Sequence, residues 1–322
     1  MYRFYFTMTF YQQDSTLAQQ SQAILAETWA AFPWLARNQL AFTWLVYDPP
    51  FPVNTGGALA STEFWTYPVR GVSYRGMERI YPASVVKLFY LVACHEWLDK
   101  GMLSPSRELD RALQDMIVDS SNDATGYVLD LLTGTTSGPE LSAGPFETWK
   151  AQRNIVNRYF QGLGWVELES INANQKTWSD GPYGREDAFV GPMRENRNML
   201  TTDATARLLH SIVGGVAVSA GRSQLMLETM YRSLDPEVLA ADPENQVVGF
   251  IGDCLPQDAR VWSKAGWTST VRHDAAYVEL PDKYPYLLVV FTEGKQASQN
   301  TDLIPFISTK VAATVPEKAI LA

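Results

Sequence analysis

β-Rich segments lie at both ends of this chain, and helical segments lie between them; this order constrains the fold more than any other feature. Residues 41–48 and 69–80 near the N-terminus have the composition of strands. Residues 259–266, 274–280 and 284–294 near the C-terminus are β-rich and separated by turns. We therefore expect an α+β fold, an α/β sandwich in which one mainly antiparallel sheet is built from both chain termini and is flanked by helices.

The middle of the chain is expected to be mostly helical. Residues 84–99 carry apolar side chains on nearly every face, which predicts a buried central helix. Hydrophobic spacing predicts further helices over residues 14–31, 105–118, 122–133, 146–161, 203–213, 220–234 and 300–314. Residues 172–199 are polar and punctuated by Gly and Pro, and loops of that length inside a domain are often functional.

The length of 322 residues is within reach of one large domain. We expect residues 1–35 to form an N-terminal helical extension and residues 36–316 to form the main domain. Within that domain, residues 36–81 and 256–316 would form the sheet half, and residues 84–250 the helical half. A functional site is expected at the seam between the two halves.

Charge and hydropathy exclude several classes of function. The formal net charge is −9 and no basic cluster exists, so we expect no binding to nucleic acid or to an anionic membrane surface. No run of about 18 apolar residues is present, so no membrane-spanning helix is expected. The N-terminal residues lack an A-x-A-like cleavage site, so we expect no signal peptide in the sequence as it stands, which is typical of a cytoplasmic protein.

Cysteine and histidine usage gives no sign of a metal or cofactor. Cys94 and Cys254 are expected to be buried free thiols, with a disulfide as the alternative. The three histidines are far apart and match no metal-binding spacing. We therefore expect neither a metal site nor a cofactor.

Three short motifs together supply the groups that acyl transfer through a serine ester requires: Ser84-Val85-Val86-Lys87, Ser120-Ser121-Asn122 and Lys264-Ala265-Gly266. Each motif alone has a structural explanation. The first is compatible with a capping Ser and a solvent-facing Lys, the second with a polar turn between helices, and the third with an edge-strand Lys beside a bulge Gly. Their order along the chain and their local settings favour the functional interpretation.

The spacing of the first motif has a clear chemical meaning. Residues three positions apart at a helix start lie on one face, so Ser84 and Lys87 are expected to be neighbours. A hydroxyl needs a base to become a nucleophile, and Lys87 acts as one only when it is neutral, which requires burial or nearby cations. Lys264 is the candidate for that second cation. Gly266 has no side chain, so a ligand backbone can approach it closely.

The chain resembles the serine penicillin-recognising hydrolases, especially class A β-lactamases and their DD-peptidase relatives. The resemblance covers roughly residues 35–315 and includes P-A-S-V-V-K-L, M-I-V-D-S-S-N-D-A-T and N-M-L-T-T-D-A-T-A-R-L-L. It implies a β-lactamase/transpeptidase-like fold and makes residues 36–316 the catalytic domain. It also implies a periplasmic or secreted protein, in contrast to the missing signal peptide.

The resemblance implies a role for each matching residue. Ser84 would be the nucleophile and Lys87 its proton acceptor, and Ser120 would pass the proton to the leaving nitrogen. Asn122 would orient the side-chain amide of the substrate, and Lys264 would attract the substrate carboxylate. The backbone N–H groups of residues 84 and 267 (Ser and Trp) would form the oxyanion hole.

Several positions depart from the family pattern. Ser121 replaces the usual Asp of the second motif, and Ala265 replaces the Thr of the third, so that Thr268 or Ser269 would have to supply the missing hydroxyl. The segment between the first two motifs is short, which predicts a more open cleft, and residues 133–180 resemble an insertion.

The residue that would activate water for deacylation is less clearly marked, because the E-x-x-L-N motif of class A enzymes is absent. Glu186 is the candidate base and Asp187 the second candidate; the alternative is a solvated acidic loop with Arg185 as partner. Arg272 is a candidate for binding the substrate carboxylate, with a salt-bridging or turn role as the alternative.

The leading functional hypothesis is a monomeric serine hydrolase that forms an acyl-enzyme, in its most specific version a β-lactamase acting on a small molecule or peptide with a carboxylate. A DD-peptidase or esterase with the same acylation machinery is the first alternative. A non-catalytic binding protein with this fold is the second.

Overall fold

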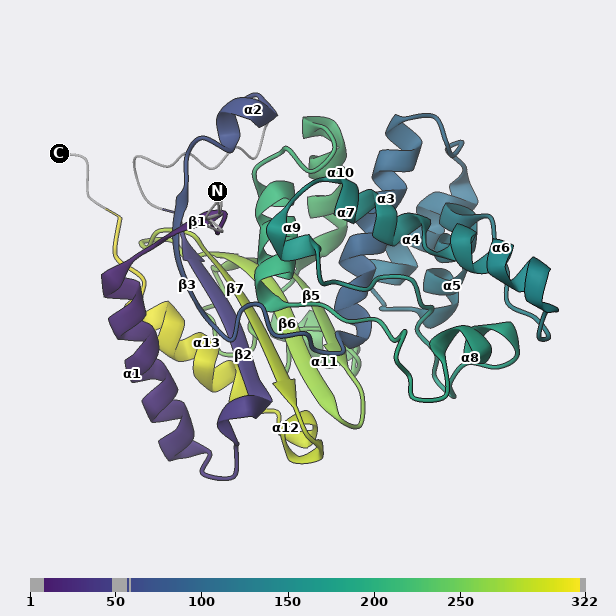
Figure 1. Cartoon of the computed structure of the whole chain (residues 1–322). Helices are drawn as coiled ribbons and strands as arrows, with labels where there is room; N and C mark the ends of the chain where they lie inside the picture. The colour runs from purple at the N-terminus through teal and green to yellow at the C-terminus, as the bar shows by residue number, and fades with distance from the viewer. Residues whose placement is uncertain (1–8, 48–56, 58, 319–322) are drawn as a thin grey trace, which may run out of the picture.

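The computed structural model describes residues 9–47, 57 and 59–318, and a single seven-stranded sheet forms its centre (Figure 1). The order across the sheet is β1-β3-β2-β7-β6-β5-β4. The strands are β1 (Tyr11–Gln13), β2 (Leu40–Val46), β3 (Val69–Tyr74), β4 (Tyr231–Arg232), β5 (Arg260–Trp267), β6 (Val271–Glu279) and β7 (Tyr286–Glu293). All neighbouring strands are antiparallel except β1 and β3, which are parallel. The predicted α+β fold, with a mainly antiparallel sheet from both termini, is confirmed.

The two ends of the chain meet where β2 pairs with β7. Leu40 lies opposite Thr292 and Val46 opposite Tyr286, and every residue of β2 is buried. Such a strand is covered on both faces, because successive side chains point to opposite sides of a sheet. The sheet therefore has a hydrophobic core on each side.

Thirteen α-helices accompany the strands in the described part of the chain. They are α1 (Ser15–Ala31), α2 (Ser61–Phe64), α3 (Lys87–Asp99), α4 (Arg107–Ile117), α5 (Asn122–Thr133), α6 (Ala143–Arg153), α7 (Ile155–Gly162), α8 (Arg185–Val190), α9 (Thr202–Val213), α10 (Ala220–Met230), α11 (Pro236–Ala241), α12 (Lys295–Gln299) and α13 (Leu303–Thr314). Three 3₁₀ helices, η1 (Arg37–Gln39), η2 (Ala83–Val86) and η3 (Val166–Leu168), complete the set.

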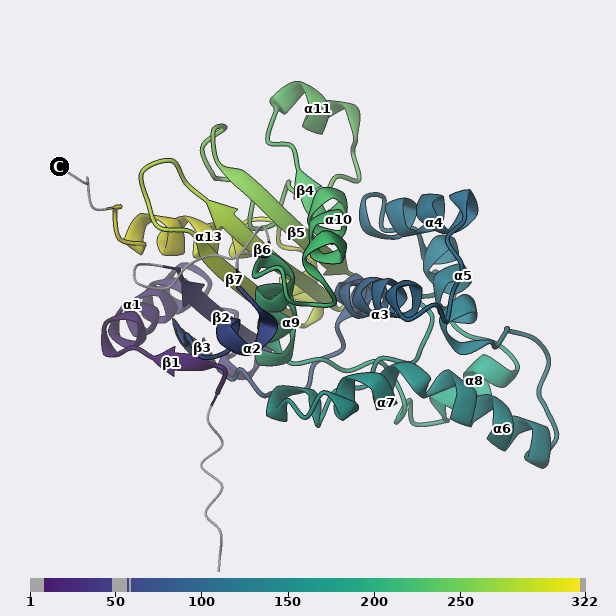
Figure 2. The ribbon, with the colours of Figure 1, turned by 90° about the horizontal axis from the view of Figure 1, so that it is seen from above.

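The helices form two groups, seen most clearly from above (Figure 2). Helices α1 and α13 cover one face of the sheet, where Leu17 of α1 and Ile304 of α13 share a core with alternate residues of β2, β6 and β7. Helix α9 lies on the other face, and α3 to α7 extend from it as the helical half of the molecule. The expected helical middle is thus present.

Helix α3 is the centre of the helical half, as its apolar sequence predicts. Eleven of its thirteen residues are buried, including Lys87 at its first position. The expected helix start at Ser84 is a 3₁₀ turn instead, because Ala83 adopts φ 45° and α3 itself begins only at Lys87. The long loop of residues 172–199 contains the short helix α8.

Residues 1–35, expected to be an extension, include β1, which pairs with β3, and α1, which packs against α13. The boundary at residue 35 stays a prediction. Cys94 and Cys254 are both free thiols, Cys94 buried and Cys254 exposed, so the expected burial holds only for the first. None of the helices described is both long and apolar enough to cross a bilayer.

Candidate active site

The nucleophile candidate Ser84 lies in η2, immediately before α3, where strand β5 passes close to the backbone. A Cβ atom on Gly266 of β5 would lie 2.8 Å from Pro82 O, Ser84 N and Val85 N. Only glycine fits at this position. A ligand backbone was expected to approach Gly266, but in the structure the backbone of η2 makes this close approach. The contact fixes the backbone N–H of Ser84 beside β5.

Ser120 is held in a strained conformation between α4 and α5. Its φ is 56°, which a residue with a side chain rarely adopts. The next residue, Ser121, caps α5 by accepting a hydrogen bond from Ala124 N at 3.1 Å. Strain of this kind is common at functional sites, where the surrounding structure holds it in place.

Lys87 reaches Ser120 and Asn122 from the first turn of α3. Its Nζ donates to Ser120 O at 2.5 Å, to Ser120 Oγ at 3.2 Å and to Asn122 Oδ1 at 3.0 Å. The side chain is fully buried, and burial lowers the pKa of Lys87 from 10.5 to about 7. An amine with that pKa is partly neutral near pH 7 and can accept a proton.

Lys264 of β5 also reaches the hydroxyl of Ser120. Its Nζ donates to Ser120 Oγ at 2.9 Å, to Ala265 O at 2.8 Å and to Gln246 Oε1 at 2.5 Å. Burial lowers the pKa of Lys264 well below its ordinary value, and the charge of Lys87 lowers it further. The hydroxyl of Ser120 thus lies between two amines that come from distant parts of the chain.

These groups surround a cavity of about 240 Å³ at the seam between the two halves. Ser84 lines it together with Ser120, Asn122, Gly266 and Trp267. Among the described residues, Ser84 Oγ has no hydrogen bond, so Ser84 in η2 and Lys87 at the start of α3 are not bonded to each other directly. Catalytic hydrogen bonds often tighten only when substrate binds.

Arg272 lies outside this cavity. Trp267 pairs with Arg272 and Lys264 with Ala275, so alternation along the strands separates Arg272 from the face that carries Lys264. The Arg272 guanidinium packs 4.7 Å from the ring of Phe250, and its Nε donates to Ser298 O at 3.0 Å.

The third motif lacks a hydroxyl in the structure as it does in the sequence. Thr268 and Ser269, which would have to supply it, are not among the residues that line the cavity.

Glu186 lies in a fully buried ion pair rather than beside Lys87. Its carboxylate accepts from Arg153 Nη2 at 2.7 Å, from Arg153 Nη1 at 3.1 Å and from Ser137 Oγ at 2.9 Å. The solvated loop and the pairing with Arg185 are therefore both wrong, because Arg185 donates to Pro139 O instead. Asp187, the second candidate, is exposed.

Three residues at the site were missed by sequence reasoning: Asp119, Glu244 and Gln246 line the cavity. Gln246 accepts from Ala265 N at 3.1 Å as well as from Lys264, and its Nε2 donates to Val118 O at 2.7 Å. It occupies the edge of β5 beyond the two-residue strand β4. Gln246 lies in a turn-rich loop, and no motif in the sequence around it indicates this role.

The described structure combines a mainly antiparallel sheet, a helical half and a group of two serines and two lysines (Ser84, Lys87, Ser120 and Lys264) around the seam between them. The sequence matches the beta-lactamase enzyme family over residues 62–315, and the chain belongs to that family. A search of the curated proteins found no match.

Solved structures share the fold at low sequence identity. A beta-lactamase from Sphaerobacter thermophilus is 19% identical, with 91% of this chain and 97% of that chain covered and a TM-score of 0.58. A mutant of PBP-A, solved as its acyl-enzyme complex with penicillin G, is 16% identical, with coverage of 94% and 97% and a TM-score of 0.62. TLA-1 extended-spectrum beta-lactamase is 14% identical, with coverage of 93% and 99% and a TM-score of 0.62.

The described residues contain no group of three or more His, Cys, Asp or Glu side chains that could hold a metal ion.

Proposed function

We propose that this protein is a serine hydrolase that forms an acyl-enzyme through Ser84 and acts on a β-lactam or a related amide. The observation that supports this most directly is the hydroxyl of Ser120, which lies 3.2 Å from Lys87 Nζ and 2.9 Å from Lys264 Nζ beside the cavity that Ser84 lines. Two buried amines of lowered pKa around one hydroxyl form a short path for protons.

In the acylation step, neutral Lys87 takes the proton of Ser84 as Oγ attacks the carbonyl carbon. The backbone N–H groups of Ser84 and Trp267 stabilise the oxyanion. The C–N bond then breaks, and the leaving nitrogen receives the hydroxyl proton of Ser120, which is replaced by the proton held on Lys87. Water later attacks the ester carbonyl, and cleavage of the ester returns Ser84 to its starting state.

Deacylation requires a base for that water, and Glu186 is our candidate. Its carboxylate is fully buried, but Ser137, which donates to it, lines a second cleft between α5 and residues 176–183. Asn122, which lines both the cleft and the Ser84 cavity, would orient the amide of the acyl group.

A second candidate function, a DD-peptidase or esterase with slow release of the acyl group, is favoured by the pairing of Glu186. Both carboxylate oxygens accept hydrogen bonds from Arg153, so neither is free to bind the attacking water. Acylation would then proceed while the acyl-enzyme persists.

An anionic group on the substrate would meet a mixed environment. Lys264 is buried behind the cavity and is not among its lining residues, whereas Asp119 and Glu244 line it, and Arg272 lies outside it. We therefore infer a weaker preference for a substrate carboxylate than the third motif alone predicts.

Intact-mass measurement during incubation with benzylpenicillin tests the proposal. A serine hydrolase gains the mass of the penicillin, and the adduct disappears quickly for a β-lactamase and slowly for the second candidate. Ser84→Ala is expected to show no adduct while its thermal unfolding stays close to that of the wild type. If the wild type shows neither an adduct nor hydrolysed penicillin, the role of Ser84 is refuted and the non-catalytic binding protein is the explanation. Equal labelling of the variant would place acylation at another residue and would also refute the role of Ser84.

A further inference from the structure

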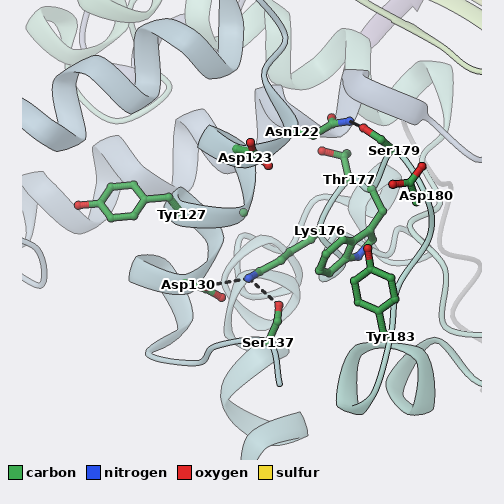
Figure 3. Close-up of a pocket in the computed structure, with 12 residues that line it drawn as sticks. Asn122, Asp123, Tyr127, Asp130, Ser137, Lys176, Thr177, Ser179, Asp180 and Tyr183 are labelled. Atoms are coloured by element: carbon green, nitrogen blue, oxygen red, sulfur yellow. Dashed lines mark hydrogen bonds and ion pairs between the residues drawn. The ribbon is translucent and has the colours of Figure 1, made fainter. Parts of the chain in front are cut away.

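A second and larger cavity adjoins the Ser84 cavity along helix α5. It measures about 600 Å³ and is walled by α5 on one side and by residues 176–183 on the other (Figure 3). Asn122 lines both cavities, so the two are adjacent, and its Nδ2 donates to Ser179 Oγ on the facing wall at 3.3 Å. Because Asn122 is the residue proposed to orient the acyl group, the larger cavity lies on the acyl side of the reacting bond.

The charges of this larger cavity are mainly negative. Asp123, Asp130 and Asp180 line it, and the only ammonium among its lining residues is that of Lys176. Lys176 Nζ is already bonded to Asp130 at 2.6 Å and to Ser137 at 2.8 Å. In the described part of the chain, Asp123 and Asp180 have no ion-pair partner, so two carboxylates are left uncompensated.

The two uncompensated carboxylates lie on opposite walls. Figure 3 places Asp123 on α5 and Asp180 on the facing segment, above Tyr183. Trp178 and Tyr183 form an edge-to-face aromatic pair on that segment, with ring centroids 5.4 Å apart. Tyr183 is 61% exposed and lines the cavity, so this residue is available to a ligand.

A buried hydroxyl at the same place also lacks a partner. Thr177 is only 7% exposed, and its Oγ1 has no hydrogen bond within the described residues. The side chain projects toward α5 in Figure 3, across the cleft between Asp123 and Asp180. Buried polar atoms are normally satisfied, so the unpaired hydroxyl in the wall of this cavity is a hydrogen-bonding group that the described residues leave unused.

From these observations we propose that the cleft beside α5 binds the acyl portion of the substrate and selects one that is extended and carries an organic cation, an ammonium or guanidinium group. Carboxylates combined with exposed aromatic faces are the environment that such cations prefer. A metal ion does not fit, because the described carboxylates form no cluster able to hold one. The assignment to the acyl side rests on the proposed function; the preference for a cation does not.

The test compares two esters that differ only in charge. Methyl 6-(trimethylammonio)hexanoate and methyl 7,7-dimethyloctanoate have the same shape, since a quaternary nitrogen replaces a quaternary carbon. Binding to Ser84→Ala, which requires no catalysis, is measured by titration calorimetry at low ionic strength. We expect the cationic ester to bind about tenfold more tightly, and the Asp123→Asn/Asp180→Asn double variant to remove most of that difference.

A matched control removes the same charge elsewhere. Asp110→Asn/Asp258→Asn changes two exposed acids that line neither cavity and is expected to keep the preference. Equal binding of the two esters, or a preference that survives in the cleft variant, would overturn the proposal.

The corresponding 4-nitrophenyl esters distinguish the cleft from the reaction. With wild-type protein, the burst of nitrophenolate reports acylation, and the cationic ester is expected to react about tenfold faster. A cation preference without any burst would refute the proposed function while supporting the cleft assignment. A burst of equal rate for both esters would support the proposed function and refute the assignment of the cleft to the acyl group.

Discussion

The buried amine of Lys87 gives the most demanding prediction, because its removal is expected to raise the stability of the protein and to lower its acylation rate. Burial lowers the pKa of Lys87 from 10.5 to about 7. Each tenfold change in proton affinity corresponds to about 1.4 kcal/mol, so the charged form costs the folded protein roughly 5 kcal/mol. Lys87→Met would remove this cost and would leave the acceptors Ser120 O and Asn122 Oδ1 unpaired, at roughly 1–2 kcal/mol each.

We therefore expect Lys87→Met to be about 2 kcal/mol more stable than the wild type at pH 6 and to lose at least about 100-fold in acylation rate. Between pH 7 and 10.5 the unfolded chain holds a proton on Lys87 that the folded protein has released, so the wild-type stability rises with pH in this window. By pH 9.5 the wild type should have gained about 3 kcal/mol relative to the variant.

Urea unfolding at pH 6, 7.5 and 9.5 measures the difference in stability, and intact mass with benzylpenicillin measures acylation. Lys100→Met, at the exposed end of the same helix, is the control and should change neither quantity appreciably. The reasoning fails if Lys87→Met is the less stable protein at pH 6, or if the stability difference does not change with pH.

Three further substitutions test other parts of the site. Gly266→Ala places a methyl group 2.8 Å from the backbone nitrogen of Ser84; we expect about 1–3 kcal/mol lower unfolding free energy by urea titration and little covalent labelling by penicillin. Glu186→Gln leaves the guanidinium of Arg153 buried with a neutral partner, so we expect a loss of about 3 kcal/mol. If the acyl-enzyme of this variant also decays at least about 100-fold more slowly in the mass assay, Glu186 is the base; an unchanged rate refutes that role. Gln246→Met removes an acceptor 2.5 Å from a buried amine of β5 and should slow acylation about tenfold, with the pH–rate profile shifted to lower pH; an unmoved profile would contradict the contact.

The parts of the fold set by local pattern were predictable from the sequence. The apolar run of α3 and the β-rich segments of β5, β6 and β7 were recognised because their periodicity and composition depend on near neighbours. The short strands β1 and β4 were not recognised, because two or three residues give no periodicity. Their pairing depends on strands far away in the sequence.

The site divides in the same way. Ser84, Ser120 and Lys264 were identifiable because each lies in a short motif, and the structure brings Ser120 and Lys264 into contact. The ion pair between Arg153 and Glu186 joins residues 33 positions apart, on helices whose packing no local pattern encodes.

The position of Arg272 could have been predicted from the sequence. Strand alternation places Arg272 and Trp267 opposite each other, so the turn between β5 and β6 already decides which face the guanidinium takes. With the pairing of Trp267 and Arg272 assumed, strand alternation alone would have placed Arg272 and Lys264 on opposite faces of the sheet.

The pairing of β2 with β7 has a consequence for synthesis of the protein. Leu40 pairs with Thr292, so roughly 250 further residues must be synthesised before β2 can pair with β7. Until then the early strands present unpaired edges and apolar faces to the cell, which makes the nascent chain a natural client for chaperones. A nonsense mutation anywhere upstream of β7 therefore yields a chain whose sheet is incomplete, rather than a shorter folded protein.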